Sequence, residues 1–131
     1  MIGEVMAEFS GKTIGIKVLP EGKIEITGQG MGKVLGAEAT IVFTGVSTPM
    51  PNGVLMVDGD GLMTTTDGDA IMLKITGIGW PTGKGWKGSY RGASYQMTQS
   101  PKLARLNKTV GVYENDSNEM GDFKLKVWEW K

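Results

Sequence analysis

The sequence predicts an all-β fold: an antiparallel barrel of about eight strands, built as one domain over residues 1–131. The turn dipeptides Asn52-Gly53 and Asp67-Gly68 tolerate the positive φ that tight hairpins require. The β-rich arms on either side of Asp67-Gly68 run for about a dozen residues, against roughly 5–6 in an ordinary strand. Glycines recur inside these arms, which indicates strands that bend. Long, bent strands joined by hairpins are typical of a sheet that closes on itself.

Further β-rich runs lie on both sides of this central hairpin. A turn at Ser10-Gly11-Lys12 is expected to separate the first two runs, and a rigid, proline-containing loop is expected at residues 48–53. Outside the hairpin, we expect strands at residues 2–9, 13–19, 23–34, 37–48, 86–99, 109–115 and 123–130.

Glycines at alternate positions mark the run 23–34. Gly28, Gly30 and Gly32 share one face of the expected strand. A dinucleotide-binding fingerprint requires a different spacing, in a turn that leads into a helix, so this run does not fit one. We therefore interpret the three glycines as positions where a side chain would collide with the opposite wall of the barrel.

The run 86–99 does not keep one apolar face. Arg91 and Tyr95 fall on one side, and Trp86 and Tyr90 fall on the other. A bulge near one of the glycines of this run would move the later apolar residues inside.

One short helix is expected near the C-terminus, over residues 101–106. Ser100 suits the N-cap, proline follows at the first helical position, and Asn107 suits a left-handed end. Leu103 and Leu106 would share a face that closes one end of the sheet.

Composition excludes several classes of function. The chain has no cysteine and no histidine, which removes thiol chemistry, the usual zinc sites and every mechanism that needs a histidine base. Fourteen basic residues balance fourteen acidic ones, whereas a nucleic-acid-binding protein usually carries a basic excess. We expect a cytoplasmic, soluble protein with no membrane segment, no metal and no cofactor.

Charge is distributed unevenly along the chain. Between Val34 and Leu73 the charged residues are all acidic, and between Ala70 and Tyr113 they are all basic. We interpret this mainly as pairing across strands, with a basic patch for an anionic ligand as the alternative. A calcium loop starting at Asp58 fails, because Met63 occupies the position that requires glycine.

Several polar residues are candidates for a site. Arg91 could hold a carboxylate through its planar guanidinium group, with Tyr90 and Tyr95 beside it. Asp58 and Asp60 share a strand face and are further ligand-binding candidates, or ion-pair partners of Arg91. Catalytic residues stay unknown, with one candidate in Asp60 and another in Glu114; Glu129 also interrupts an apolar stretch.

The order of these motifs resembles that of small prokaryotic proteins with an allene-oxide-cyclase-like barrel. The resemblance covers most of the chain from Gly28 onward. It is carried by the alternate glycines, Phe43-Thr-Gly45, Asp58-Gly-Asp-Gly61, Thr66-Asp-Gly-Asp69, the segment Thr98 to Asn107 and the terminal Trp128-Glu-Trp130. It implies an eight-stranded calycin-like barrel that forms dimers or trimers. Many such proteins have no assigned activity, whereas plant cyclases of that fold rearrange an unsaturated epoxy fatty acid without a cofactor. No pocket residue of those enzymes can be matched to this chain.

The function expected first is binding of a small apolar or amphipathic molecule, one bearing a carboxylate included. A cofactor-free isomerase or cyclase that uses a barrel carboxylate, and a structural module without ligand, are the alternatives. A near-zero net charge and two tryptophans on one face of the last strand, Trp128 and Trp130, predict a homo-oligomer.

Overall fold

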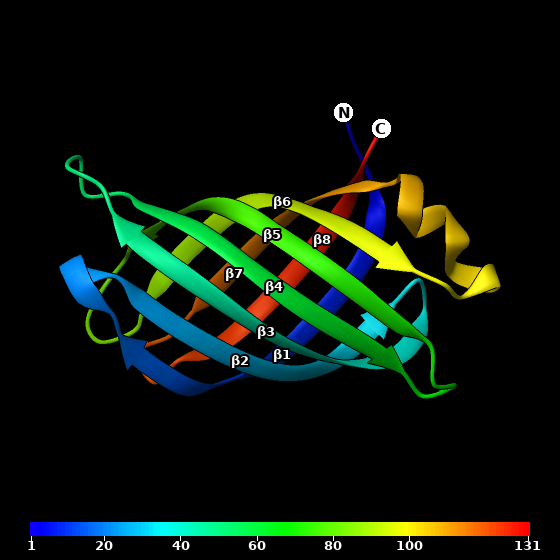
Figure 1. The fold of residues 1–131 in the computed structure, drawn as a ribbon, viewed down its shortest axis with the longest axis horizontal. Helices are drawn as coiled ribbons and strands as arrows, with labels where there is room; N and C mark the ends of the chain where they lie inside the picture. The colour runs from blue at the N-terminus through cyan, green and yellow to red at the C-terminus, as the bar shows by residue number, and fades with distance from the viewer.

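The chain folds into one closed barrel of eight antiparallel strands. The structure is a computed structural model that describes all residues from Met1 to Lys131. Each strand pairs with the next along the chain, and β1 pairs with β8 to close the barrel (Figure 1). The strands are β1 (Ile2–Val18), β2 (Ile24–Val34), β3 (Ala37–Pro49), β4 (Leu55–Thr65), β5 (Ala70–Pro81), β6 (Gly88–Thr98), β7 (Val110–Ser117) and β8 (Asp122–Trp130). The predicted barrel and strand number are confirmed.

The two strands expected at the start of the chain are one. β1 runs through Ser10-Gly11-Lys12 without a turn and pairs there with both β2 and β8. A Cβ atom on Gly11 would lie 2.0 Å from the carbonyl oxygen of Gln29. This glycine therefore serves a close approach of two strands, and the prediction of a turn was wrong. Register shifts between Thr13 and Gly15 bend the strand instead.

The central hairpin forms as predicted, from β4 and β5 joined at Asp67-Gly68. The alternate glycines of β2 also face the interior as predicted. A Cβ atom on Gly28 would lie 2.5 Å from the ring of Phe43. That ring meets the ring of Phe123 edge to face, with centroids 5.2 Å apart. Small residues on β2 thus leave room for aromatic side chains from β3 and β8.

β6 contains no bulge, so the prediction of one near Gly88 or Gly92 was wrong. Its pairing with β5 and with β7 is regular from end to end. Tyr95 and Met97 are exposed on the outer face, 49% and 63% respectively. The apparent conflict in the run 86–99 arises because the outer face of the barrel is itself partly apolar.

The short helix is a 3-10 helix, η2 (Pro101–Lys108), and a second 3-10 turn, η1 (Pro20–Gly22), joins β1 to β2. Leu103 and Leu106 are buried, as predicted. Ser100 makes no side-chain cap. The Asn107 side chain bonds to the backbone of Thr98, accepting from its N–H at 2.8 Å and donating to its carbonyl at 3.0 Å. η2 is therefore held at the end of the barrel by its buried leucine face and by the two hydrogen bonds from Asn107 to the end of β6.

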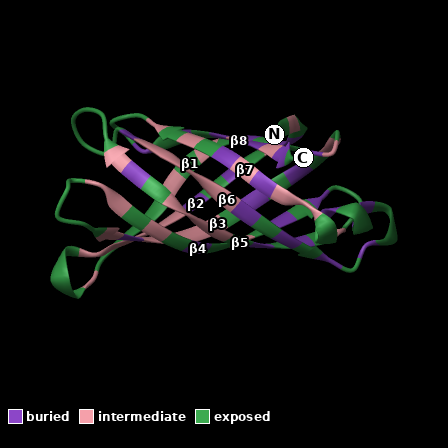
Figure 2. Ribbon diagram, turned by 90° about the horizontal axis from the view of Figure 1, so that it is seen from above, coloured by how far each residue is buried: buried purple, intermediate pink, exposed green.

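The two ends of the barrel differ. η2, both chain termini and the β2–β3 and β4–β5 turns lie at one end, and the other four hairpin connections lie at the opposite end (Figure 1). Met6, Val34, Ile71 and Leu106 are among the fully buried side chains. Buried residues gather toward the η2 end of the ribbon (Figure 2). We call this the plugged end and the opposite end the mouth. No helix of the structure has the length and apolarity needed to cross a membrane.

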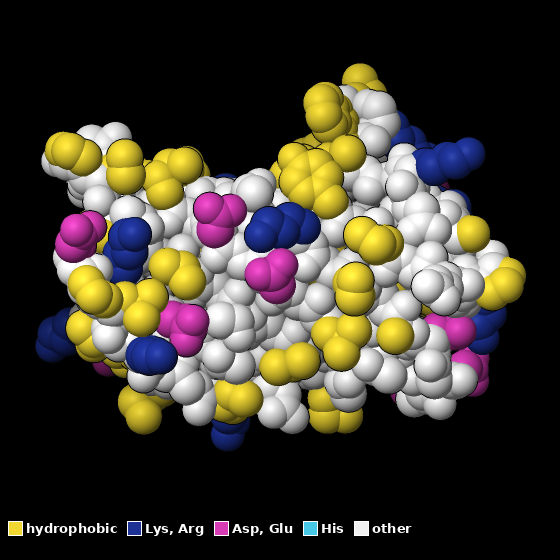
Figure 3. Space-filling model, in the orientation of Figure 1, with side chains coloured by type: hydrophobic (Ala, Val, Ile, Leu, Met, Phe, Trp, Pro, Cys, Tyr) yellow, Lys and Arg dark blue, Asp and Glu magenta, His cyan; other side chains and the backbone are white.

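The outer wall carries apolar side chains in a row across four neighbouring strands. Val42, Leu62, Met72 and Met97 are register partners from β3 to β6. Each is at least 40% exposed. Figure 3 shows apolar side chains spread over this side of the molecule, with only a few charged groups between them. A second outer patch lies on β1 and β8, where Ile2 is the register partner of Trp130 and both are 60% exposed.

Candidate ligand-binding cavity

A cavity occupies the barrel interior between the packed core and the mouth. Its volume is about 100 Å3, and a volume of roughly 10–15 Å3 is enough to hold one water molecule. Met6 and Met63 lie at its deep end, and Thr13, Trp86 and Ser117 lie near the mouth. The barrel interior is therefore open toward one end and filled at the other.

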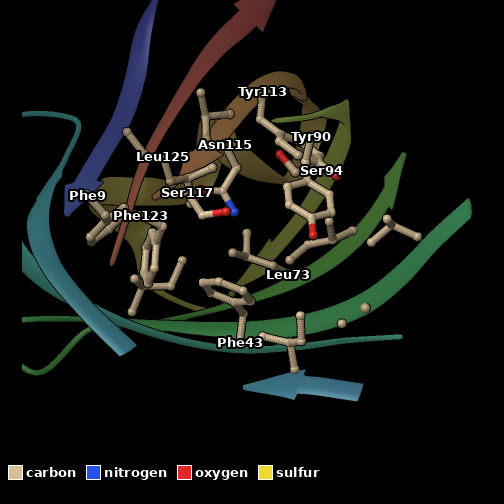
Figure 4. A pocket seen from close by; sticks show the side chains of 18 of the residues that line it. Phe9, Phe43, Leu73, Tyr90, Ser94, Tyr113, Asn115, Ser117, Phe123 and Leu125 are labelled. Carbon is tan, nitrogen blue, oxygen red and sulfur yellow. The ribbon is translucent and has the colours of Figure 1, made fainter. Parts of the chain in front are cut away.

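Most of the cavity wall is apolar. Sixteen of the 23 lining residues are hydrophobic, with Phe9, Ile41, Phe43, Leu73 and Leu125 among them (Figure 4). No lysine, arginine, aspartate or glutamate belongs to the lining. A site of this kind gains free energy mainly by removing apolar surface from water.

Two glycines on facing positions of β3 and β4, Gly45 and Gly59, line the cavity and have different roles. A Cβ atom on Gly45 would touch nothing closer than a Val57 methyl group at 3.7 Å, so a side chain there would enter free space. A Cβ atom on Gly59 would lie 2.5 Å from the carbonyl oxygen of Thr44. The first glycine therefore provides volume, and the second permits close packing of the backbone.

Most of the polar side chains that line the cavity lie along β6 and β7; Thr13 of β1 and Ser47 of β3 are the others. Tyr90 and Ser94 come from β6, and Tyr113, Asn115 and Ser117 come from β7 (Figure 4). Tyr90 and Asn115 are direct register partners. Because β6 and β7 are neighbouring strands, these groups form a polar stripe in a largely apolar wall.

Some groups of the polar stripe are satisfied within the protein. The Ser94 hydroxyl donates to the Gln96 side-chain carbonyl at 2.5 Å, and the Ser117 hydroxyl donates to the Trp86 carbonyl at 2.6 Å. The Asn115 Oδ1 atom is covered and has no partner. The hydroxyls of Tyr90 and Tyr113 make no hydrogen bond with the protein. Unlike Asn115 Oδ1, both oxygen atoms are still partly accessible. Both phenols therefore remain open to the cavity.

Glycines on β5 provide the space in which the two tyrosines lie. A Cβ atom on Gly77 would lie 2.5 Å from the Tyr113 hydroxyl, and one on Gly79 would lie 2.4 Å from the Tyr90 ring. Burial raises the pKa of Tyr113 to about 12, with a smaller contribution from the nearby Tyr90. Burial also raises the pKa of Tyr90. Both side chains are therefore neutral donors near neutral pH.

Trp86 stands at the mouth on the β5–β6 connection and is 41% exposed. Its backbone N–H donates to the Glu119 carbonyl at 3.2 Å, and its backbone carbonyl accepts from the Ser117 hydroxyl. The backbone on both sides of the indole is thus tied to the β7–β8 hairpin, which holds the ring at the rim of the cavity.

Of the site residues predicted from the sequence, only Tyr90 lines the cavity. Asp58, Asp60, Tyr95 and Glu114 lie at outward-facing positions, as does Arg91, because each alternates with an inward-facing neighbour on its strand. They are therefore on the solvent side of the wall that encloses the cavity.

Three of the four outward-facing charged candidates, Asp60, Arg91 and Glu114, pair across strands, and of their pairs only that of Asp60 joins the acidic and basic segments as we had expected. Arg91 contacts Glu114 at 3.7 Å and Asp116 at 2.9 Å, and its guanidinium lies 5.8 Å from the Trp80 ring centroid. Asp60 contacts Lys74 at 3.6 Å. The partners of Arg91 come from β7, not from Asp58 or Asp60 on β4 as one of our expectations had it.

One ionisable side chain is buried in the plugged end, outside the cavity lining. Glu129 on β8 is 3% exposed and is paired with Arg105 of η2; Lys131 lies 3.8 Å away. This ion pair ties η2 to the barrel wall.

Tyr113, Asn115 and Ser117 line the cavity but were not predicted as site residues. A signal was present, because these three alternate with Glu114 and Asp116. An uncharged face and an acidic face on one strand indicate which side is enclosed.

Comparisons with known proteins show the fold. No family model matches the chain, and no curated protein matches it. A conserved protein of unknown function from Rhodopseudomonas palustris superimposes with a TM-score of 0.81 at 12% identity, over 98% of this chain and 97% of its own. A protein of unknown function from Clostridium acetobutylicum gives 0.79 at 15% identity, over 98% of both chains. A β-barrel-like protein from Acinetobacter baumannii gives 0.78 at 19% identity, over 100% of this chain and 96% of its own.

Proposed function

We propose that this barrel binds a small, largely apolar molecule inside its cavity, with entry at the mouth. The observation that carries the proposal is the apolar, uncharged cavity that stays open at one end of a barrel whose other end is packed. A purely structural module has no need for such a space, since interiors normally pack without voids much larger than a water molecule.

An amphipathic ligand fits the same geometry. Its apolar part would occupy the cavity, and a carboxylate would stay at the mouth, where Lys84 and Lys87 flank Trp86 in the sequence and are exposed. An ionised group is costly inside a wall that offers no countercharge. The resemblance to allene-oxide-cyclase-like barrels supports this class of ligand.

Catalysis is the less supported alternative. Proton transfer requires a general acid or base within hydrogen-bond reach of the substrate. The candidates Asp60 and Glu114 are outside the wall, and the lining has no carboxylate. Binding is therefore the function that the cavity supports best.

Filling the cavity tests the proposal. In Gly45→Leu, the new Cβ atom has room and the side chain projects into the cavity, so the variant should fold and should lose binding. Gly15→Leu is the matched control, because a Cβ atom on this exposed β1 residue also meets nothing closer than 3.8 Å. Binding of a series of alkanes and methyl ketones is measured by calorimetry and by the rise in melting temperature. Equal binding by wild type and Gly45→Leu would place the ligand elsewhere.

A further inference from the structure

We infer that the cavity selects ligands bearing an uncharged hydrogen-bond acceptor, such as a ketone, aldehyde or ester carbonyl, and holds that oxygen with the hydroxyls of Tyr113 and Tyr90. The inference rests on the proposed function and names the chemical class of its ligand. It concerns the buried part of the ligand, not a group at the mouth.

The first argument is which donors remain free. Three hydroxyls of the lining already donate within the protein, those of Thr13, Ser94 and Ser117. The hydroxyls of Tyr90, Tyr113 and Ser47 have no protein acceptor, and of these the two phenols lie on the neighbouring strands β6 and β7. Buried phenols usually find a partner, and a donor left unpaired on binding loses free energy. A ligand acceptor supplies what both tyrosines lack.

The second argument is the absence of charge. An anionic ligand group in this part of the cavity would have no lysine or arginine in the lining to balance it. A carbonyl oxygen accepts the same hydrogen bonds without the cost of burying an ion. Because burial raises the pKa of both tyrosines, neither phenol becomes an anion that would repel an acceptor near neutral pH.

The third argument is that the two donors are held in place. Tyr113 reaches across to β5 so that its hydroxyl lies beside Gly77, and the Tyr90 ring lies against Gly79 two residues along the same strand. Because both positions are glycine, the two tyrosine side chains fit there; a side chain at either position would occupy the same space. The donors are therefore positioned before the ligand arrives, which lowers the cost of ordering them on binding.

The test compares two probes of similar length, nonane and 2-nonanone, on four proteins. Tyr113→Phe and Tyr90→Phe each remove one hydroxyl and keep the ring. Tyr95→Phe is the matched control, since Tyr95 is the one other tyrosine and lies on the outer wall. In calorimetry, each inner variant should bind 2-nonanone about 3–10-fold more weakly than wild type, as expected for one lost hydrogen bond. Their affinity for nonane, and both affinities of Tyr95→Phe, should change by less than about 2-fold.

A spectroscopic readout needs no variant. The carbonyl stretch of 2-nonanone bound to wild type should move to lower frequency than in alkane solvent, and Tyr113→Phe should move it back. Binding of both probes with no effect of the inner variants and no frequency shift would overturn this inference and leave the proposed function in place. Failure of wild type to bind either probe would overturn the proposed function itself. Tighter binding of octanoate than of 2-nonanone, weakened by the inner variants, would replace the neutral acceptor by an anion.

Discussion

Raising the pH should destabilise the barrel through Tyr113. The pKa of this phenol is about 12 in the folded protein, because it is buried, against an ordinary value of 10. Between these two pH values the unfolded chain loses the tyrosine proton and the folded chain keeps it. The folded state then binds more protons than the unfolded state, so the free energy of unfolding falls as pH rises. This part of the stability is fully present below about pH 10 and is lost by about pH 12.

The size of the effect follows from the same two values. A difference of two pKa units, from 10 to about 12, corresponds to about 2–3 kcal/mol at about 1.4 kcal/mol per unit. Urea denaturation followed by tryptophan fluorescence, at intervals between about pH 9 and pH 12, measures it. Burial also raises the pKa of Tyr90, so the relevant quantity is the difference between wild type and Tyr113→Phe.

The free energy of unfolding of wild type should fall by about 2–3 kcal/mol relative to that of Tyr113→Phe across the range, because only wild type has this phenol to ionise. Absorbance of phenolate near 295 nm gives an independent check, since near pH 10 the folded wild type should show no more phenolate than Tyr113→Phe, although it has one more tyrosine. A constant difference between the two proteins would show that Tyr113 is solvated in the folded state and would refute the reasoning.

Three further predictions concern stability and assembly. Gly59→Ala should lower the free energy of unfolding by about 1–3 kcal/mol, because its Cβ would lie 2.5 Å from a carbonyl oxygen of β3, whereas Gly45→Ala should change it by less than about 1 kcal/mol; equal effects in urea denaturation would contradict the packing argument. Arg91→Met should cost about 1 kcal/mol or less, since its acidic partners are more than half exposed, and Arg105→Met should cost about 2–3 kcal/mol, since it leaves a buried carboxylate on β8 with only a lysine at 3.8 Å; the reverse order would show that the plugged end is hydrated. Sedimentation at micromolar concentration should show a dimer or trimer that Trp130→Lys weakens, because the exposed indole and its β1 neighbour form an apolar patch; a wild-type monomer at every concentration would reject this assembly.

The barrel could be predicted because its signals are local. Turn dipeptides and alternating glycines depend on neighbouring residues alone, and they mark β2, β4 and β5 correctly. The failure at Gly11 has the same origin. A glycine in a turn and a glycine under a crossing strand look alike in sequence, and only the pairing partner, here Gln29, distinguishes them.

The candidate site was harder to predict, because it depends on which face of each strand is enclosed. Arg91 attracted attention through its chemistry, yet its neighbour Tyr90 is the residue that points inward. Along β6 the outer face carries Tyr95 and Met97, so hydrophobicity does not mark the interior. Sequence alternation on β7 carried the information, but it becomes decisive only when β7 is known to lie beside β6.

The positions of the chain ends have a practical consequence. The amino group of Met1 bonds to the carbonyl oxygen of Lys131 at 2.6 Å, and both residues lie at the plugged end, away from the mouth. A tag or surface linker attached at either end would leave the opening facing the solution, which suits immobilised-ligand screening. The same proximity suits circular permutation: a short peptide could join the native ends, and new ends could be cut at the exposed β4–β5 turn without disturbing the rim.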